Sequence, residues 1–142
     1  MIAKKFGRIV NTTSGSVKAP SAGLDLSSGA RAGLTAFFAG VARNVAASNV
    51  TINFLLPGVF ATDRFQTYVE TTMKKKGISA EAALAERVAA VPARRIGDPD
   101  EFGAACAFLC SAQAGYITGQ NLLIDGGAFS GRFLAEEHSM QY

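Results

Sequence analysis

The sequence lacks the patterns that mark several broad classes of protein. No apolar stretch approaches the roughly 20 residues needed to cross a bilayer, and the first residues lack the apolar core of a signal peptide. We therefore expect a soluble cytoplasmic protein with no membrane partner. The excess of positive charge is small, with 14 Lys and Arg against 11 Asp and Glu. Its densest run, the lysines at 74–76, is typical of a solvated helix end, so we expect no nucleic-acid partner.

Metal ligands and hydrolytic motifs are also scarce. The only histidine, His138, lies in a polar tail, far along the chain from Cys106 and Cys110. These two thiols fall in a helical apolar pattern with no other soft ligand nearby, so we expect buried, reduced cysteines and no metal site. A serine hydrolase is disfavoured because the chain has no Gly-x-Ser-x-Gly elbow and a single histidine to act as base.

Apolar residues, by contrast, are plentiful. They make up 49% of the 142 residues, and the mean hydropathy is +0.20, which excludes a disordered protein and predicts a substantial core. This hydrophobicity is high for a lone small domain, so we expect a partner or a missing part of the fold to cover some of the surface. No internal repeat or linker occurs, and residues 1–142 are interpreted as a single domain.

The periodicity predicts an α/β domain with three strands and about four helices. Short apolar runs predict strands at residues 8–11, 50–56 and 121–124. The expected helices cover residues 28–47, 64–76, 79–90 and 98–111. A strand, a helix and a strand in this order favour a parallel sheet with flanking helices.

Local signals fix several helix ends. Asp98 is a cap residue followed by proline at the first helical position and by Glu101 three residues on, which is a strong start signal. Ser79 is the expected cap of the preceding helix. Along the long helix, small residues such as Gly29 and Gly33 are interpreted as permitting close approach to the sheet or to another helix.

Residues 58–64, Gly-Val-Phe-Ala-Thr-Asp-Arg, are the most informative stretch. They follow the apolar run 50–57, so a buried strand enters a Pro-Gly turn that presents a hydroxyl and a carboxylate just past its carboxyl end. Open α/β sheets bind ligands at that edge, which predicts a ligand-facing loop. The helices expected at 64–90 follow directly, and they either form a lid over the strand ends or cover the sheet.

Three segments in this order resemble the C-terminal half of a short-chain dehydrogenase/reductase: residues 7–14, the Pro-Gly loop, and residues 116–127. The resemblance extends from about Gly7 to Ala128. It implies a Rossmann-like parallel sheet and an oxidoreductase that moves hydride between NAD or NADP and a small carbonyl or alcohol. Family members are about twice as long, and no Gly-x-Gly-x-x-Gly turn, which would hold the pyrophosphate, occurs here.

The resemblance also implies which residues form the catalytic site. Ser14 falls on the serine that polarises the substrate carbonyl, Ser27 on the catalytic tyrosine, and Arg31 on the lysine four residues later. No Tyr-x-x-x-Lys occurs anywhere in the chain. A serine hydroxyl is a far weaker acid than a phenol, and an arginine cannot relay a proton, so the usual acid/base step is removed. Ser14 can instead cap its loop, and Asp25 is either a substitute proton acceptor or a solvated turn residue.

The resemblance assigns cofactor contacts to the Pro-Gly loop. Pro57, Gly58, Val59 and Thr62 match the pattern that holds the nicotinamide carboxamide and the neighbouring phosphate, and Arg31 can still bond a ribose. The segment Asp125-Gly126-Gly127 matches a last-strand signature expected to pack against a neighbouring subunit.

Two functional hypotheses follow. The first is an NAD- or NADP-linked oxidoreductase of this family that is inactive as this chain alone. The alternative is a catalytically silent protein of the same fold that binds a nucleotide or a partner. In either case we expect a homo-oligomer or association with a separate N-terminal half, because the strand at 8–11 would otherwise be an unpaired edge.

Overall fold

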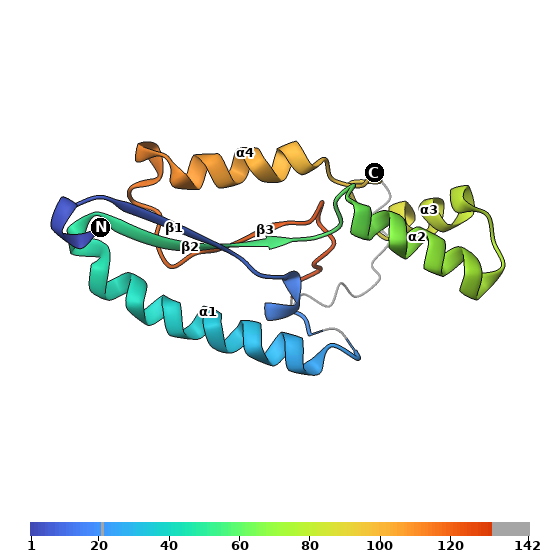
Figure 1. Cartoon of the computed structure of the whole chain (residues 1–142), viewed down its shortest axis with the longest axis horizontal. Helices are drawn as coiled ribbons and strands as arrows, with labels where there is room; N and C mark the ends of the chain where they lie inside the picture. The colour runs from blue at the N-terminus through green and yellow to red at the C-terminus, as the bar shows by residue number, and fades with distance from the viewer. Residues whose placement is uncertain (21, 132–142) are drawn as a thin grey trace, which may run out of the picture.

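The computed structural model of the chain describes residues 1–20 and 22–131, and its centre is a three-stranded parallel sheet (Figure 1). The strands are β1 (Gly7–Thr12), β2 (Val50–Pro57) and β3 (Asn121–Ile124), arranged in the order β1-β2-β3. In this register Thr12 lies opposite Leu55, and Pro57 lies opposite Ile124. The expected parallel α/β sheet is confirmed, with each strand within one residue of its predicted ends.

One helix covers each face of the sheet. Figure 1 shows α1 (Asp25–Val45) on one side and α4 (Pro99–Cys110) on the other. On the first face, the ring of Phe38 lies 6.3 Å from that of Phe54 in β2. On the second face, Leu55 packs with Leu109 of α4. Because both faces are covered, β2 is buried from Val50 to Leu56, which explains its nearly continuous apolar sequence.

Helix α1 lies against the sheet through small side chains. Its buried residues are Ser28, Thr35 and Ala42, seven residues apart along one face. Part of the predicted apolar stripe is not covered, since Phe37 is 65% exposed. The expectation that Gly29 permits close approach to the sheet is wrong, because a side chain there would meet nothing within 4 Å, and the same holds for Gly33. Close approach by a helix of another polypeptide stays a prediction.

Helix α4 begins at the predicted cap. The Asp98 carboxylate accepts a hydrogen bond from the Asp100 amide at 2.9 Å, and Glu101 accepts one from the Asp98 amide at 2.9 Å. Arg95 donates to both Glu101 carboxylate oxygens at 2.6 Å. These bonds hold the pKa of Glu101 well below its usual 4.5, at about 2, with the Arg95 hydrogen bonds as the largest cause.

Helices α2 (Asp63–Lys76) and α3 (Ala80–Ala89) form a hairpin that covers neither face of the sheet. Figure 1 shows them packed on each other beyond the carboxyl ends of the strands. Gly77 ends α2 with a positive φ of 65°, and the Ser79 hydroxyl accepts from the Ala82 amide to begin α3. An exposed ion pair between Lys76 and Glu86, at 2.6 Å, links the helices. The interpretation that they cover the sheet is therefore wrong.

The two cysteines are free thiols on α4, but they are less buried than predicted. Cys106 is half-buried and Cys110 is exposed, which corrects the expectation for the second thiol. Burial is the main cause that raises the pKa of Cys106, with Cys110 contributing further. His138 lies outside the described residues. Within residues 1–20 and 22–131, no helix has both the length and the apolar composition needed to cross a membrane.

Candidate functional site

The predicted site residues follow the carboxyl ends of neighbouring strands. The Thr13 amide donates to the Leu55 carbonyl at 3.0 Å, which extends the β1–β2 pairing by one residue. The Gly58 amide donates to the Ile124 carbonyl at 2.8 Å, which extends the pairing of β2 with β3 by one residue. Since parallel strands end at the same edge, the loop at Ser14 and the loop at 57–62 lie side by side, where open α/β sheets bind ligands.

Ser14 caps the turn that follows β1. Its Oγ accepts a hydrogen bond from the Ser16 amide at 3.2 Å, and the short 3-10 turn η2 (Gly15–Val17) packs against α1. The loop-capping interpretation of Ser14 is confirmed. The cap uses a lone pair of the hydroxyl and leaves its O–H as a donor, so capping and binding a carbonyl are compatible.

Ser27 and Arg31 meet on the first turns of α1. The helix begins at Asp25, three residues earlier than predicted, so Ser27 belongs to it. Arg31 donates from Nη1 to the Ser27 hydroxyl and, at 3.3 Å, to the Ser27 backbone carbonyl. The four-residue spacing of the two positions thus places both side chains on one face of the helix. The charged guanidinium of Arg31 therefore contacts a hydroxyl that does not ionise at neutral pH.

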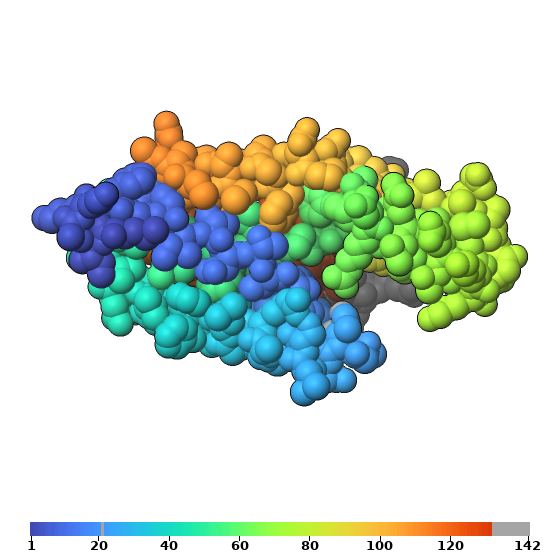
Figure 2. All heavy atoms as spheres, viewed as in Figure 1, coloured from blue at the N-terminus to red at the C-terminus, as the bar shows by residue number. Residues whose placement is uncertain are grey.

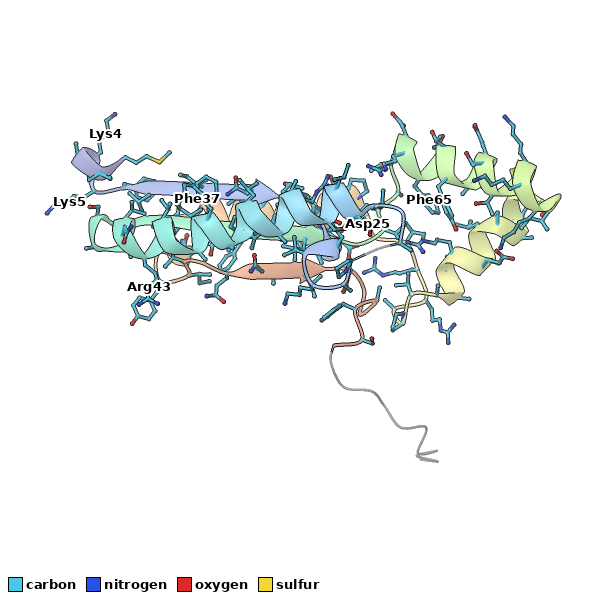
Figure 3. All side chains as sticks on the ribbon, turned by 90° about the horizontal axis from the view of Figure 1, so that it is seen from below. Lys4, Lys5, Asp25, Phe37, Arg43 and Phe65 are labelled. Atoms are coloured by element: carbon cyan, nitrogen blue, oxygen red, sulfur yellow. The ribbon has the colours of Figure 1, made fainter. Side chains whose placement is uncertain are left out.

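Asp25 lies exposed at the start of α1. Figure 3 shows it at the end of the helix nearest α2, with Arg43 at the opposite end. A carboxylate in the first turn of a helix is stabilised by the helix dipole, which is the ordinary role for this residue type.

The chain segment after Gly58 is held by a residue that the sequence analysis did not single out. The Gly97 amide donates to the Val59 carbonyl at 3.0 Å, and the Ala61 amide donates to the Gly97 carbonyl at 2.9 Å. A side chain at position 97 would lie 2.7 Å from the Phe60 ring, so the close approach requires glycine. The sequence contains one indication of this role, which is that a glycine stands immediately before the Asp98 cap.

Gly58 is fixed by a similar contact with the end of β3. A Cβ at this position would lie 2.6 Å from the Asp125 Cα, so only glycine fits. The Asp125 carboxylate accepts from the amides of Gly127 and Phe129, each at 2.9 Å. Gly126, with φ of 64°, packs against Val91 of the same chain. The glycine pair therefore has an internal packing role, and its contact with a neighbouring subunit stays a prediction.

Thr62 has a free hydroxyl at the start of α2, and its contact with a ligand stays a prediction. The residue is exposed, it immediately precedes α2, and its side chain makes no capping hydrogen bond to that helix. Pro57 is half-buried at the end of β2. The loop thus presents a hydroxyl beside a closely packed Pro-Gly backbone, as the sequence pattern predicted.

Buried polar atoms near Ser14 were also missed. Asn11 Nδ2 and Thr13 Oγ1 are buried without a hydrogen-bond partner among the described residues, as is Ser28 Oγ on α1. Asn11 pairs in register with Phe54, whose side chain faces α1. Polar atoms that a protein buries without partners are ordinarily satisfied by water or a ligand. The only sequence signal was polar residues at the end of an otherwise apolar strand.

Figure 2 shows an indentation between the start of α1 and the α2–α3 hairpin. A separate small cavity of about 90 Å³ lies behind the loop, between Val59, Arg95, Glu101 and Asp125. Its lining does not include Ser14, Ser27 or Arg31, so the candidate site is the open edge and not this cavity.

Comparison with known proteins assigns the chain to a family. A family model described as "Enoyl-(Acyl carrier protein) reductase" matches residues 1–128. The chain is 38% identical over 128 residues to the NADPH-dependent reductase BacG of Bacillus subtilis (strain 168), covering 90% of this chain and 49% of that protein. It is 38% identical over 129 residues to the 3-oxoacyl-[acyl-carrier-protein] reductase FabG of Haemophilus influenzae, covering 91% and 49%.

Solved structures agree. YwfH, described as an NADPH dependent reductase involved in bacilysin biosynthesis, superposes with a TM-score of 0.84 at 35% identity, covering 92% of this chain and 50% of that one. A variant of actinorhodin polyketide ketoreductase solved with NADPH gives 0.81 at 27% identity, covering 94% and 50%. The chain belongs to the short-chain dehydrogenase/reductase family and has part of its Rossmann-like fold. It spans about half the length of the curated relatives it matches.

Proposed function

We propose that this chain carries the nicotinamide and substrate side of an NAD- or NADP-linked oxidoreductase that acts on a small carbonyl or alcohol. The observation that carries the proposal is the hydrogen-bonded Ser27–Arg31 pair, which the sequence resemblance aligns with the family's catalytic tyrosine and lysine. Support comes from the loops that hold Ser14 and Thr62, which follow neighbouring strands at one edge of the sheet. The family membership and the reductase relatives agree with it.

The residues present fit one end of the cofactor. The exposed Thr62 hydroxyl and the tightly packed Pro57-Gly58 backbone would hold the nicotinamide end, and the free donors of Arg31 would bond a ribose hydroxyl. The buried unpartnered atoms of Asn11 and Thr13 fit a site that receives polar groups. No Gly-x-Gly-x-x-Gly string in the sequence fits the pyrophosphate. When bound, the cofactor supplies or accepts the hydride.

The chain's own groups can polarise a substrate carbonyl but cannot supply the proton. The Ser14 O–H can donate to a carbonyl oxygen and polarise it, since its cap uses only a lone pair. The Arg31 charge stabilises negative charge that develops on that oxygen. Neither Ser27 nor Arg31 can deliver a proton near neutral pH, so this set orients and polarises a substrate without completing the acid/base step. Position alone favours a lid role for α2 and α3, which lie beyond the strand ends.

A catalytically silent protein is the second candidate. It is favoured by the missing phenol and by the uncovered apolar side chains of α1, with Leu26 93% exposed and Phe37 65% exposed. In this case the fold binds a nucleotide or a polypeptide and no turnover is required. In both cases we propose a cytoplasmic protein that works as a homo-oligomer or with a separate N-terminal half.

Fragments of the cofactor test the proposal directly. We expect nicotinamide mononucleotide to bind the full chain, measured by titration with NMR detection, and AMP not to bind, because only the nicotinamide end has a site. Arg31→Met should weaken the binding, whereas Arg43→Met, an exposed change at the other end of the same helix, should not. Equal binding of both nucleotides, or equal loss in both variants, would overturn the assignment. Titration with NADH and NADPH in the presence of a separate N-terminal half then separates the two candidates, since turnover in that complex favours the oxidoreductase and binding without turnover favours the silent protein.

A further inference from the structure

Two thiols stand one helical turn apart on α4, on the face of the sheet opposite α1. Cys106 and Cys110 are separated by four residues, so their side chains share one face of the helix. Cys106 is half-buried and packs against the core around Leu55 and Leu109, whereas Cys110 is exposed in the last turn. The pair therefore has an apolar inner side and an outer side that is open to solvent.

Small residues keep the outer side of this pair accessible. Gly103 lies three residues before Cys106, Ala107 lies three residues before Cys110, and both small residues are exposed. Nothing lies within 4 Å of the position that a Cβ at Gly103 would take. A small ion can therefore approach both sulfur atoms without displacing a large side chain.

The spacing keeps the two cysteines reduced. Residues four apart on a helix have Cβ atoms about 5–6 Å apart, whereas a disulfide requires about 3.5–4.5 Å between them. An S–S bond would therefore distort the last turns of α4. Burial, with a further contribution from Cys110, raises the pKa of Cys106, so this group is a thiol near neutral pH. The pair is thus available as two free thiols.

A metal ion between the sulfurs suits this separation better than an S–S bond does. Metal–thiolate bonds are about 2.3 Å long, so an ion bonded to both sulfurs in a straight line holds them roughly 4.6 Å apart. Among residues 1–20 and 22–131, no group of three or more His, Cys, Asp and Glu side chains is placed to hold a metal. Zinc prefers four ligands, whereas soft thiolates select copper(I), which accepts two. The pair therefore fits a soft, two-coordinate cation.

Arg8 supplies a compensating charge next to the pair. A copper(I) ion with two thiolates carries one net negative charge, which the carboxyl end of a helix disfavours. The Arg8 guanidinium donates from Nε to the carbonyl of Ser111, the residue after Cys110, at 3.0 Å. Figure 1 shows this end of α4 beside the beginning of β1. The positive charge of Arg8 thus lies where it offsets the negative charge of the complex.

We propose that Cys106 and Cys110 form a copper(I) site. On binding, the two thiols release two protons, two Cu–S bonds form, and the oxidation state of the copper does not change. This differs from the expectation of no metal site, which took both thiols to be buried. The copper site lies near the amino ends of the strands, whereas the candidate site for cofactor and substrate lies at their carboxyl ends. It is therefore independent of the proposed oxidoreductase function.

Competition with a chelator tests the proposal. Copper(I) bicinchoninate, a coloured complex, is titrated with the full chain in the absence of oxygen. We expect each chain to withdraw one copper(I) ion, and we expect an equal concentration of zinc(II) not to prevent this. Cys110→Ala should abolish the withdrawal while keeping the fold, checked by circular dichroism, because the residue is exposed. A wild-type chain that leaves the copper with bicinchoninate, or that prefers zinc(II), refutes the proposal.

A relocated thiol separates binding by this pair from binding by any two thiols. Ala104→Cys combined with Cys106→Ala keeps two cysteines on α4 but places them six residues apart, about 9 Å along the helix axis. One ion cannot bond to both, so the withdrawal of copper should be lost. His138→Ala removes the single histidine of the sequence and should leave copper binding unchanged. Binding retained in the relocated variant, or lost in His138→Ala, overturns the assignment to Cys106 and Cys110.

Discussion

Arg31 donates from a single nitrogen, Nη1, to both the hydroxyl and the backbone carbonyl of Ser27, one helical turn earlier. The sequence resemblance aligns these two positions with a catalytic tyrosine and lysine, and the four-residue spacing is kept while both side chains differ. The contact therefore joins two groups that cannot perform a proton transfer near neutral pH.

We predict no measurable reduction of carbonyl compounds by the chain alone with NADH or NADPH. The chain offers no phenol at position 27 and no Gly-rich pyrophosphate turn. Loss of cofactor absorbance at 340 nm is the standard measurement for nicotinamide oxidation, roughly one NADH per turnover. Turnover well above a buffer blank that disappears in Ser14→Ala would contradict the prediction and would require another proton donor.

Gly58→Ala should destabilise the fold by about 1–3 kcal/mol, the usual cost of forcing an extra methyl into a packed site. The added Cβ would lie 2.6 Å from the Asp125 Cα, and backbone cannot move aside cheaply. Gly103→Ala is the matched control, because nothing lies within 4 Å of its Cβ position inside α4. That change should instead stabilise by about 0.5–1 kcal/mol. Urea unfolding of both variants at equal protein concentration measures the difference, and equal midpoints would contradict it.

Glu101 should make the fold sensitive to acid. Its pKa is held at about 2 in the fold against 4.5 without these bonds, so the ionised form is favoured in the folded state. A depressed pKa contributes stability above pH 4.5, and that contribution is lost as the pH falls toward about 2. The stability difference between wild type and Glu101→Gln should therefore shrink over this window. Denaturation midpoints at pH 6, 4 and 2.5 test this, with Asp100→Asn as the control from the same helical turn; a difference independent of pH would refute it.

We also predict that the chain does not remain a monomer in solution. Within the part of the chain that the structure describes, β1 pairs with a strand on one side only, and α1 leaves Leu26, Leu34 and Phe37 exposed. Unpaired edges and apolar helix faces recruit partners, so we expect a dimer, a larger species or a complex with a separate N-terminal half. Multi-angle light scattering decides the matter. A monodisperse, cooperatively folding species of 14.8 kDa would exclude it.

The sequence predicted the elements well because their signals are local. The cap at Asp98 and the cap at Ser79 are both observed with the expected hydrogen bonds. The start of α1 was placed three residues too late, because Leu24 precedes that helix without any side-chain cap that could announce it. The run 50–56 identified β2 for the same local reason, since it is apolar apart from Thr51 and Asn53.

Long-range contacts could not be predicted. Arg8 donates from Nε to the Ser111 carbonyl at 3.0 Å across 103 residues of sequence. Asn53 donates to the Ile117 carbonyl at 2.8 Å and accepts from the Gln120 amide at 3.0 Å, which fixes the approach to β3. Nothing in the local pattern separates such residues from solvated polar ones. An apolar stripe likewise does not reveal whether it is covered, as the exposed Phe37 shows.

For the site, the resemblance singled out Ser14, Ser27, Arg31 and the Pro-Gly loop. The fold brings the loop at Ser14 and the Pro-Gly loop to one edge of the sheet, and it places Ser27 and Arg31 in the first turns of α1. The resemblance did not reveal Gly97, because its role depends on a neighbour that is distant in sequence. Their proposed roles in binding and chemistry stay predictions until the titrations above are made.

The bridge between Phe60 and Gly97 closes the base of the α2–α3 hairpin. The chain leaves the sheet and returns to it at one point, and of the residues between, Val91 and Ala93 contact Gly126 after β3, which leaves α2 and α3 as an insert. Because the entropy of closing a loop rises only slowly with its length, an insert of another size can replace this one while β2 and α4 keep their places. The size and sequence of the hairpin can therefore diverge while the sheet stays constant, and grafting hairpins between relatives would test whether the hairpin affects ligand selectivity.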